Sequence, residues 1–115
     1  MKLKITPSPD NTALVAFEQD HLDAGNVKQF RDAMAPCLTR HRAVLLDMQA
    51  LTFIDSSGLG ALLACLRSMH GRDGQLVLFG VRPPVLALLE LVRMHRLFAI
   101  FATEQEARDD VLAGH

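Results

Sequence analysis

The chain of 115 residues is long enough for one domain with a substantial core, and 50% of its residues are hydrophobic while 22% are charged. A formal net charge of −1 gives no general attraction to nucleic acid or to an anionic membrane, so neither direct nucleic-acid binding nor membrane insertion is expected. Because no stretch resembles a signal peptide or a membrane span, and no Cys-x-x-Cys pair or Cys/His cluster suggests a metal, we expect a cytoplasmic protein without metal or cofactor.

The first predicted elements are two short strands that pair as a hairpin. Leu3 and Ile5 alternate with polar residues, as in a half-exposed strand, and the apolar run at residues 12–17 predicts a second strand. Prolines, Asp and Asn at residues 7–11 predict the turn between them. The lysines beside Leu3 suit a strand at the edge of the sheet.

A loop at residues 18–23 follows and is expected to end in a helix cap. The first helix is then predicted from apolar residues at helical spacing, which are Val27, Phe30, Met34 and Leu38. Residues 43–46 form an apolar run without helical period, typical of a strand that is buried on both faces. Phe53 and Ile54 are expected to return to the core.

Residues 55–57, Asp-Ser-Ser, mark the start of a second helix because each can cap backbone N–H groups with a side-chain oxygen. The core face of this helix is predicted from Leu59, Leu62, Leu63 and Leu66. A second stripe contains only small side chains, which are Ser57, Ala61, Ala64, Cys65 and Ser68. The preceding strand therefore leads into a helix whose N-terminus carries hydroxyl groups at the carboxyl edge of the sheet, with Ser57 in the first turn.

The rest of the chain repeats the alternation of strand and helix. The predicted elements are a turn at residues 71–74, a strand at 75–79, a helix beginning at 83, a strand at 97–101 and a terminal helix opened by a capping-box sequence at 103–106. Alternating strands and helices imply right-handed crossovers. We therefore predict a single α/β domain over residues 1–115, with an N-terminal hairpin and one layer of helices on a mixed, mostly parallel sheet.

The sequence also contains partial matches to two kinds of site, a dinucleotide-binding site and a serine hydrolase site. The Gly-x-Gly at residues 58–60 lacks the third glycine of a dinucleotide fingerprint. Ser57, His21 and Asp20 lie at one edge of the predicted sheet and are a candidate hydrolase triad, although no oxyanion loop accompanies them. The same polar residues at the helix start are also accounted for as a simple N-terminal cap. Spacing alone therefore assigns no catalytic residue.

Residues 53–63, FIDSSGLGALL, closely resemble the signature of the STAS domain of bacterial anti-anti-sigma factors. The resemblance extends over nearly the whole chain. For example, Glu18-Gln19-Asp20 with Ala24 is similar to the loop before the family's first helix. Two features depart from the family pattern. Phe17 and Gln19 stand where the family usually has a glycine and an aliphatic residue, and Val92-Arg93-Met94 stands where it often has Thr-Gly-Leu.

This resemblance implies a non-catalytic anti-sigma factor antagonist. Such a protein binds an anti-sigma factor that is also a serine kinase; phosphorylation of the second serine of the motif, here Ser57, releases it, and a serine/threonine phosphatase restores it. We expect the partner to contact Asp20, His21, Asp55, Ser56, Ser57, Gly58, Ala61, Ala64, Cys65 and Ser68. A non-catalytic STAS subunit or scaffold of a transporter or signalling complex is the alternative, and a small serine hydrolase is a further one.

Overall fold

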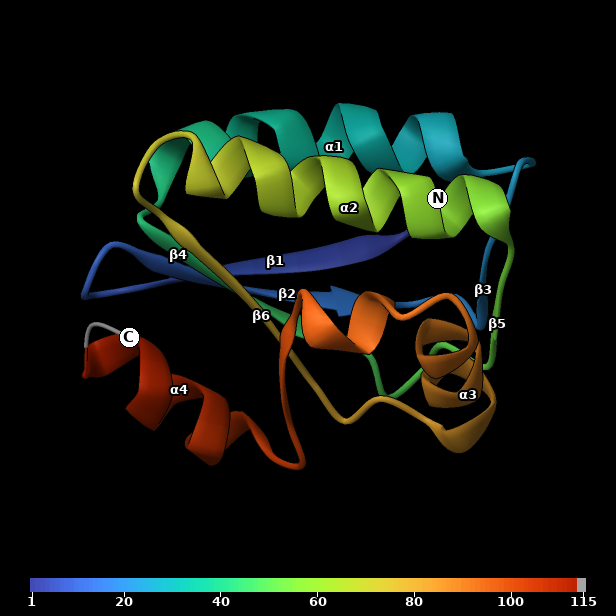
Figure 1. The fold of residues 1–115 in the computed structure, drawn as a ribbon. Helices are drawn as coiled ribbons and strands as arrows, with labels where there is room; N and C mark the ends of the chain where they lie inside the picture. Colours follow the sequence, from blue (N-terminus) through green and yellow to red (C-terminus); the bar gives the residue numbers. More distant parts are fainter. Residues whose placement is uncertain (114–115) are drawn as a thin grey trace.

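A five-stranded sheet in the order β1-β2-β4-β6-β7 forms the centre of the computed structural model, which describes residues 1–113 (Figure 1). Its strands are β1 (Leu3–Ser8), β2 (Thr12–Phe17), β4 (Ala43–Asp47), β6 (Gln75–Phe79) and β7 (Ala99–Phe101). β1 is antiparallel to β2, and every other neighbouring pair is parallel. The predicted hairpin, the edge position of the first strand and the mixed, mostly parallel sheet are therefore confirmed.

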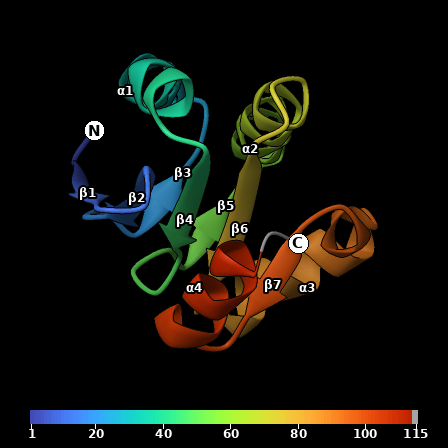
Figure 2. The ribbon, with the colours of Figure 1, turned by 90° about the vertical axis from the view of Figure 1, so that its left-hand side faces the viewer.

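Helices cover both faces of this sheet. α1 (Val27–Arg40) and α2 (Ser56–His70) lie side by side on one face, and α4 (Glu104–Leu112) lies on the other (Figure 2). α3 (Pro83–Leu91) and the short 3₁₀ helix η1 (Met94–Arg96) connect β6 to β7. The prediction of one helical layer was therefore wrong. The spacing of apolar residues in α4 indicates that the helix packs on the sheet, but it does not indicate which face of the sheet the helix covers.

The side chains of the central strand β4 pack into a hydrophobic core on each face of the sheet. Successive side chains of a strand point to opposite faces, and all four residues from Ala43 to Leu46 are fully buried. Val44 and Leu46 belong to the larger core beneath α1 and α2. Ala43 and Leu45 belong to a smaller core that is closed by α4. The predicted burial of this strand on both faces is confirmed.

A second, two-stranded sheet was not predicted. β3 (His21–Leu22) pairs in parallel with β5 (Phe53–Ile54) beyond the carboxyl ends of β2 and β4. Because side chains alternate, Ile54 is buried while Phe53 is 52% exposed, so the expectation that both return to the core was wrong for Phe53. The two strands of this small sheet lie in the segments that fix the position of the N-terminus of α2.

Two element boundaries also differ from the prediction. β1 continues through Pro7 to Ser8, because a proline that lacks an N–H group is tolerated at the edge of a sheet. The last strand begins only at Ala99, since Arg93 turns the chain with a left-handed φ of 62° and η1 follows. None of the helices within residues 1–113 is long and apolar enough to cross a membrane.

Candidate functional site

The N-terminus of α2 is capped by Asp55, as its position before two serines suggested. One carboxylate oxygen, Oδ1, accepts a hydrogen bond of 2.9 Å from the Gly58 N–H group, and Oδ2 accepts one of 3.1 Å from the Ala24 N–H group. These bonds lower the pKa of the Asp55 carboxyl, with the Gly58 bond as the largest cause. Asp55 therefore starts the helix and ties it to the loop before α1.

Two serine hydroxyls occupy the first turn of α2. Ser56 is exposed and Ser57 is half-buried. Because Asp55 supplies the cap, neither hydroxyl is needed for it, and neither forms a side-chain hydrogen bond within residues 1–113. The positive end of the helix dipole favours an added anion at this position. The predicted place of Ser57 in the first helical turn is confirmed.

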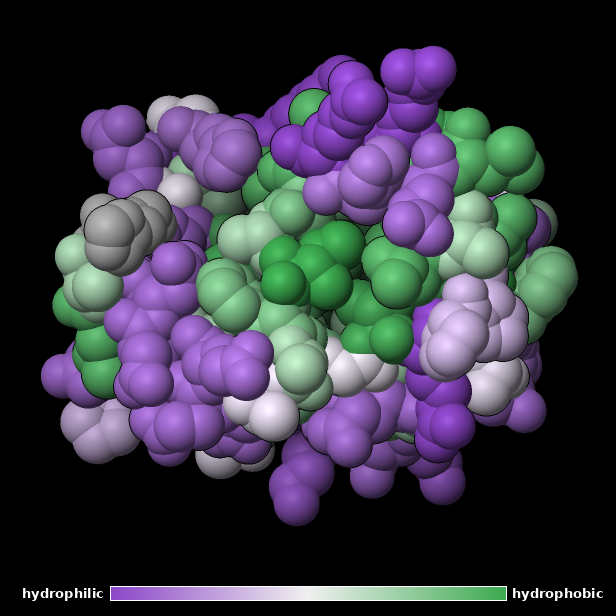
Figure 3. Space-filling model, turned by 60° about the horizontal axis from the view of Figure 1, so that its bottom comes forward, coloured by the Kyte–Doolittle hydropathy of each residue, from purple (hydrophilic) through white to green (hydrophobic). Residues whose placement is uncertain are grey.

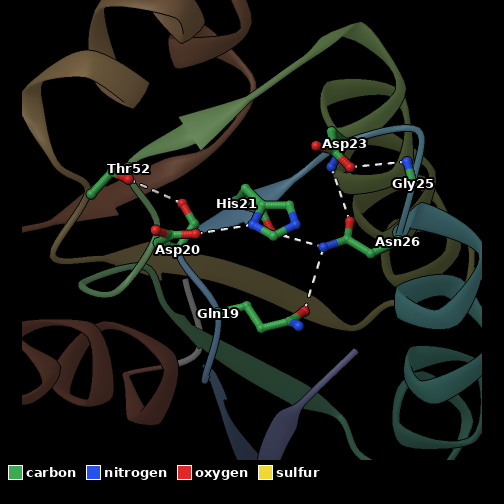
Figure 4. Close-up of polar contacts among 7 residues, drawn as sticks. All are labelled: Gln19, Asp20, His21, Asp23, Gly25, Asn26 and Thr52. Atoms are coloured by element: carbon green, nitrogen blue, oxygen red, sulfur yellow. Dashed lines mark hydrogen bonds and ion pairs between the residues drawn. The ribbon is translucent and has the colours of Figure 1, made fainter.

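Asp20 and His21 form an ion pair on the loop beside this helix start. Nδ1–H of His21 donates to Oδ1 of Asp20 at 3.0 Å, and both side chains are substantially exposed (Figure 4). The hydrogen bond lowers the pKa of the Asp20 carboxyl and raises the pKa of the His21 imidazole. No hydrogen bond joins His21 to Ser57 among the described residues, so the structure does not assemble the candidate triad.

Backbone hydrogen bonds hold the loop at residues 18–23, here called the acidic loop, against the segment that precedes α2. The carbonyl of Asp20 accepts from the N–H groups of Thr52 and Phe53 at 2.8 and 3.1 Å and from the Thr52 hydroxyl at 3.1 Å. The carbonyl of Leu22 accepts from the Asp55 N–H group at 3.2 Å. Segments about thirty residues apart in sequence therefore place Asp20, His21 and Asp55 at one end of the molecule.

The buried side chain of Asn26 also stabilises this loop, and the predictions from the sequence did not include this residue. It is buried, and its Nδ2 group donates to the carbonyl of His21 at 3.0 Å while its Oδ1 accepts from the Asp23 N–H group at 3.0 Å (Figure 4). Asn26 also holds the N-cap position of α1, although its side chain makes no hydrogen bond to the first turn of that helix. The helix cap expected at the end of the loop 18–23 therefore lies three residues later, and the loop itself contains the strand β3. An asparagine just before an apolar helical pattern is a capping signal that would have identified it.

The stripe of small residues on α2 is divided between the core and the surface. Ala61 is fully buried, Cys65 is 5% exposed, and Gly58 is buried as well. Ala64 and Ser68 are exposed. The expectation of one outward-facing stripe is corrected for Ala61 and Cys65, which are buried because small side chains let α2 approach its neighbours closely.

Gly58 shows how close that approach is. A Cβ atom added there would lie 2.6 Å from the carbonyl oxygen of Leu22 and 2.6 Å from Cγ1 of Ile54. Ala61 and Cys65 face α1 across a groove whose other wall includes Met34 and Leu38. The cysteines are free thiols, and burial raises the pKa of Cys65 to about 11.

A separate apolar hollow of about 600 Å³ lies at the carboxyl ends of β4, β6 and β7. It is lined by Val81, Leu86, Ile100 and Phe101 together with polar residues, and Figure 3 shows hydrophobic residues gathered in the middle of the face on which α4 lies. α3 begins here with two prolines, which have no N–H group to offer an anion. The hollow contains none of the residues predicted for partner binding.

Comparison with known proteins identifies the kind of domain. Residues 4–107 match the family model of the STAS domain. The chain is 31% identical over 100 residues to a STAS-domain containing protein of Pseudomonas aeruginosa, covering 87% of this chain and 99% of that one. It is 27% identical over 109 residues to the anti-sigma F factor antagonist of Paenibacillus polymyxa, covering 93% of each. The unphosphorylated anti-sigma factor antagonist SpoIIAA has a similar fold, with a TM-score of 0.83, 23% identity and 97% of each chain covered.

Proposed function

The chain belongs to the STAS domain family, and on that premise we propose that it is an anti-sigma factor antagonist without catalytic activity of its own. Its partner is an anti-sigma factor that is also a serine kinase. Binding occurs while Ser57 carries a free hydroxyl, and phosphorylation of Ser57 releases the partner. A serine/threonine phosphatase returns the protein to the binding form.

The observation that carries this proposal is the pair of unused hydroxyls at an already capped helix start. Phosphorylation adds roughly −1.5 to −2 charges, and the N-terminus of α2 tolerates an anion. The fold therefore survives the modification. The assignment to Ser57 rather than the more exposed Ser56 rests on the resemblance to the family motif.

The surroundings of Ser57 explain why the modification would release a partner. Asp20 has a side chain that is 77% exposed, and Asp55 lies directly before the two serines. A phosphate on this end adds like charge to a surface that is already acidic. A partner that fits the bare hydroxyl then meets both extra volume and unpaired charge, which are strong grounds for rejection at an interface.

The test is binding and phosphorylation of four variants by the anti-sigma factor kinase purified from the native cell. Ser57→Ala should bind as tightly as the wild type, and Ser57→Asp should bind at least about tenfold more weakly, which corresponds to about 1.4 kcal/mol. Ser56→Ala and Ser56→Asp are matched controls one residue away. Phosphopeptide mapping after incubation with kinase and ATP should find phosphate on Ser57, and phosphate confined to Ser56 or found on neither serine contradicts the proposal.

A further inference from the structure

The apolar hollow at the carboxyl ends of β4, β6 and β7 has the size and the position of a small-molecule site. Its volume of about 600 Å³ lies within the range of about 300–1,000 Å³ that is usual for such sites. Ligands of α/β proteins often bind in a crevice outside the carboxyl ends of the strands. None of the residues proposed to contact the anti-sigma factor lines this hollow, so the proposed function does not account for it.

The walls of the hollow are mainly aliphatic and aromatic. Val81 and Leu86 come from the segment that leads into α3 and from α3 itself, while Ile100 and Phe101 come from β7. All four side chains are only partly buried. They therefore keep apolar surface in contact with water, and a ligand with an apolar body would be favoured because it removes that surface from water.

A guanidinium group stands at the rim of the hollow. Arg82 is exposed, and its Nε donates to the carbonyl of Gln49 at 2.6 Å. This bond fixes the base of the group, while both terminal nitrogens make no hydrogen bond within residues 1–113. The two terminal nitrogens of an arginine form a fork that matches the two oxygens of a carboxylate. Arg82 is thus placed to hold a carboxylate at the edge of an apolar surface.

The nearby acidic side chains of the described chain do not neutralise Arg82. Oδ1 of Asp47 accepts from the backbone N–H and the side-chain amide of Gln49, at 2.9 and 3.1 Å, and Oε2 of Glu106 accepts from the Ala102 N–H group at 3.4 Å. Neither carboxylate lines the hollow, and within residues 1–113 no carboxylate oxygen lies within 4.0 Å of the Arg82 guanidinium. Arg82 is the one charged side chain among the residues that line the hollow.

We propose that this hollow binds a carboxylic acid with an apolar body, such as a medium-chain fatty acid. The carboxylate accepts hydrogen bonds from the terminal nitrogens of Arg82, and the hydrocarbon chain lies against the four apolar side chains of the walls. An inorganic anion would leave these walls uncovered, and a neutral apolar molecule would leave the guanidinium unpaired. The site does not depend on the proposed function at Ser57.

The experiment is a titration of the ¹⁵N-labelled protein with octanoate below its micelle concentration, at constant pH and ionic strength. We expect saturable amide shifts at residues 80–82 and 100–102 with millimolar or tighter Kd. Octan-1-ol has the same apolar chain without the charge and should bind at least about fivefold more weakly, because it forms no charge-assisted hydrogen bond. Acetate has the charge without the chain and should give no saturable shifts.

Arg82→Gln should weaken octanoate binding at least about fivefold and leave octan-1-ol binding unchanged, because the substitution removes the charged donor but not the walls. Arg96→Gln is the matched control, since it removes the same charge from an exposed residue of η1 outside the hollow. It should bind octanoate like the wild type. The amide spectrum of each variant reports whether it is folded, and the comparison of the three ligands on the wild type decides the matter without any variant.

Four results would overturn the proposal. They are the absence of saturable shifts with octanoate, shifts centred on the groove between α1 and α2 instead, equal binding of octanoate and octan-1-ol, and equal weakening by the Arg82 and Arg96 variants.

Discussion

Arg93 adopts a backbone conformation that its side chain disfavours. Its φ of 62° and ψ of 20° lie in the left-handed region, at the position where STAS domains often have glycine. A residue with a Cβ atom in this region costs roughly 1–2 kcal/mol. Replacing the family's glycine has thus left a strained turn between α3 and η1.

We predict that Arg93→Gly raises the free energy of unfolding by about 1 kcal/mol, because relief of the left-handed strain exceeds the greater entropy of glycine in the unfolded chain. Urea denaturation of the two proteins measures the difference. Arg96→Gly is the control, because Arg96 lies in η1 with an ordinary helical backbone, and it should destabilise. A loss of stability in the Arg93 variant would show that its side chain contributes more than its backbone costs.

The exposure of neighbouring alanines on α2 separates a packing effect from a binding effect. Ala61 is fully buried against α1, whereas Ala64 in the next turn is exposed. We predict that Ala61→Arg greatly lowers the melting temperature, because overpacking and a buried charge both destabilise. Ala64→Arg should leave the melting temperature nearly unchanged while weakening partner binding. If Ala64→Arg leaves binding intact, the partner surface does not include this position.

The ion pair between Asp20 and His21 shifts the pKa of the His21 imidazole in a known direction. Since the hydrogen bond from Asp20 raises the pKa of His21, we predict an imidazole titration above 6.5 by NMR, and a return toward 6.5 in Asp20→Asn. The pair stabilises the folded state fully between pH 3.8 and pH 6.5. This contribution is lost as the pH rises through the raised pKa of His21, and also as the pH falls through the lowered pKa of Asp20. An unchanged His21 titration in the variant would show that the pair does not persist in solution.

At the scale of elements, the start of α2 depends on both oxygens of one carboxylate. Asp55→Ala removes the bonds to Gly58 and Ala24, and we predict a loss of about 1–2 kcal/mol of unfolding free energy. Asp55→Asn keeps only one side-chain oxygen and should lose an intermediate amount. Thermal denaturation at neutral pH measures both, and equal losses in the two variants would show that the one side-chain oxygen which asparagine keeps contributes little.

The wild-type advantage over Asp55→Asn should also depend on pH. Because the pKa of Asp55 is lowered in the folded state, its carboxylate contributes stability above pH 3.8, and this contribution is lost as the pH falls through the lowered pKa.

α4 closes the second face of the sheet through a narrow set of contacts. Val111 is 1% exposed within the smaller core, whereas Leu112, the next residue, is 54% exposed. We predict that Val111→Ala lowers the free energy of unfolding by about 2 kcal/mol. Leu112→Ala should change it by less than about 0.5 kcal/mol, as expected for a surface position. Similar losses at both positions would mean that α4 packs in a different orientation.

For the molecule as a whole, the sequence predicted those features that local patterns determine. The first strand, the apolar run of β4 and the Asp-Ser-Ser helix start each depend on a few adjacent residues, and the structure has all three elements. The alternation expected within the first strand was wrong for Ile5, which is exposed. The family motif added the assignment of Ser57. These are the parts for which short-range chemistry and tertiary packing favour the same conformation.

The features that were missed depend on partners distant in sequence. β3 and β5 have only two residues each, too few for a periodic signal, and they exist because they pair with each other. Small residues on a helix fit an open surface and a close helix contact equally well, so Ala61 and Cys65 could not be placed by their size. The face that α4 covers follows from sheet geometry, which its own apolar spacing does not contain.

The pairing of β3 with β5 has a consequence for motion. The acidic loop and the start of α2 are joined by a few backbone hydrogen bonds to the carbonyls of Asp20 and Leu22, outside the main sheet. Such small units open locally with a lower free energy than global unfolding. We predict that the amides of Thr52, Phe53 and Asp55 exchange with deuterium at similar rates, and faster than those of β4. A partner that binds this end of the molecule would therefore slow their exchange together, giving a readout of occupancy that requires no label on either protein.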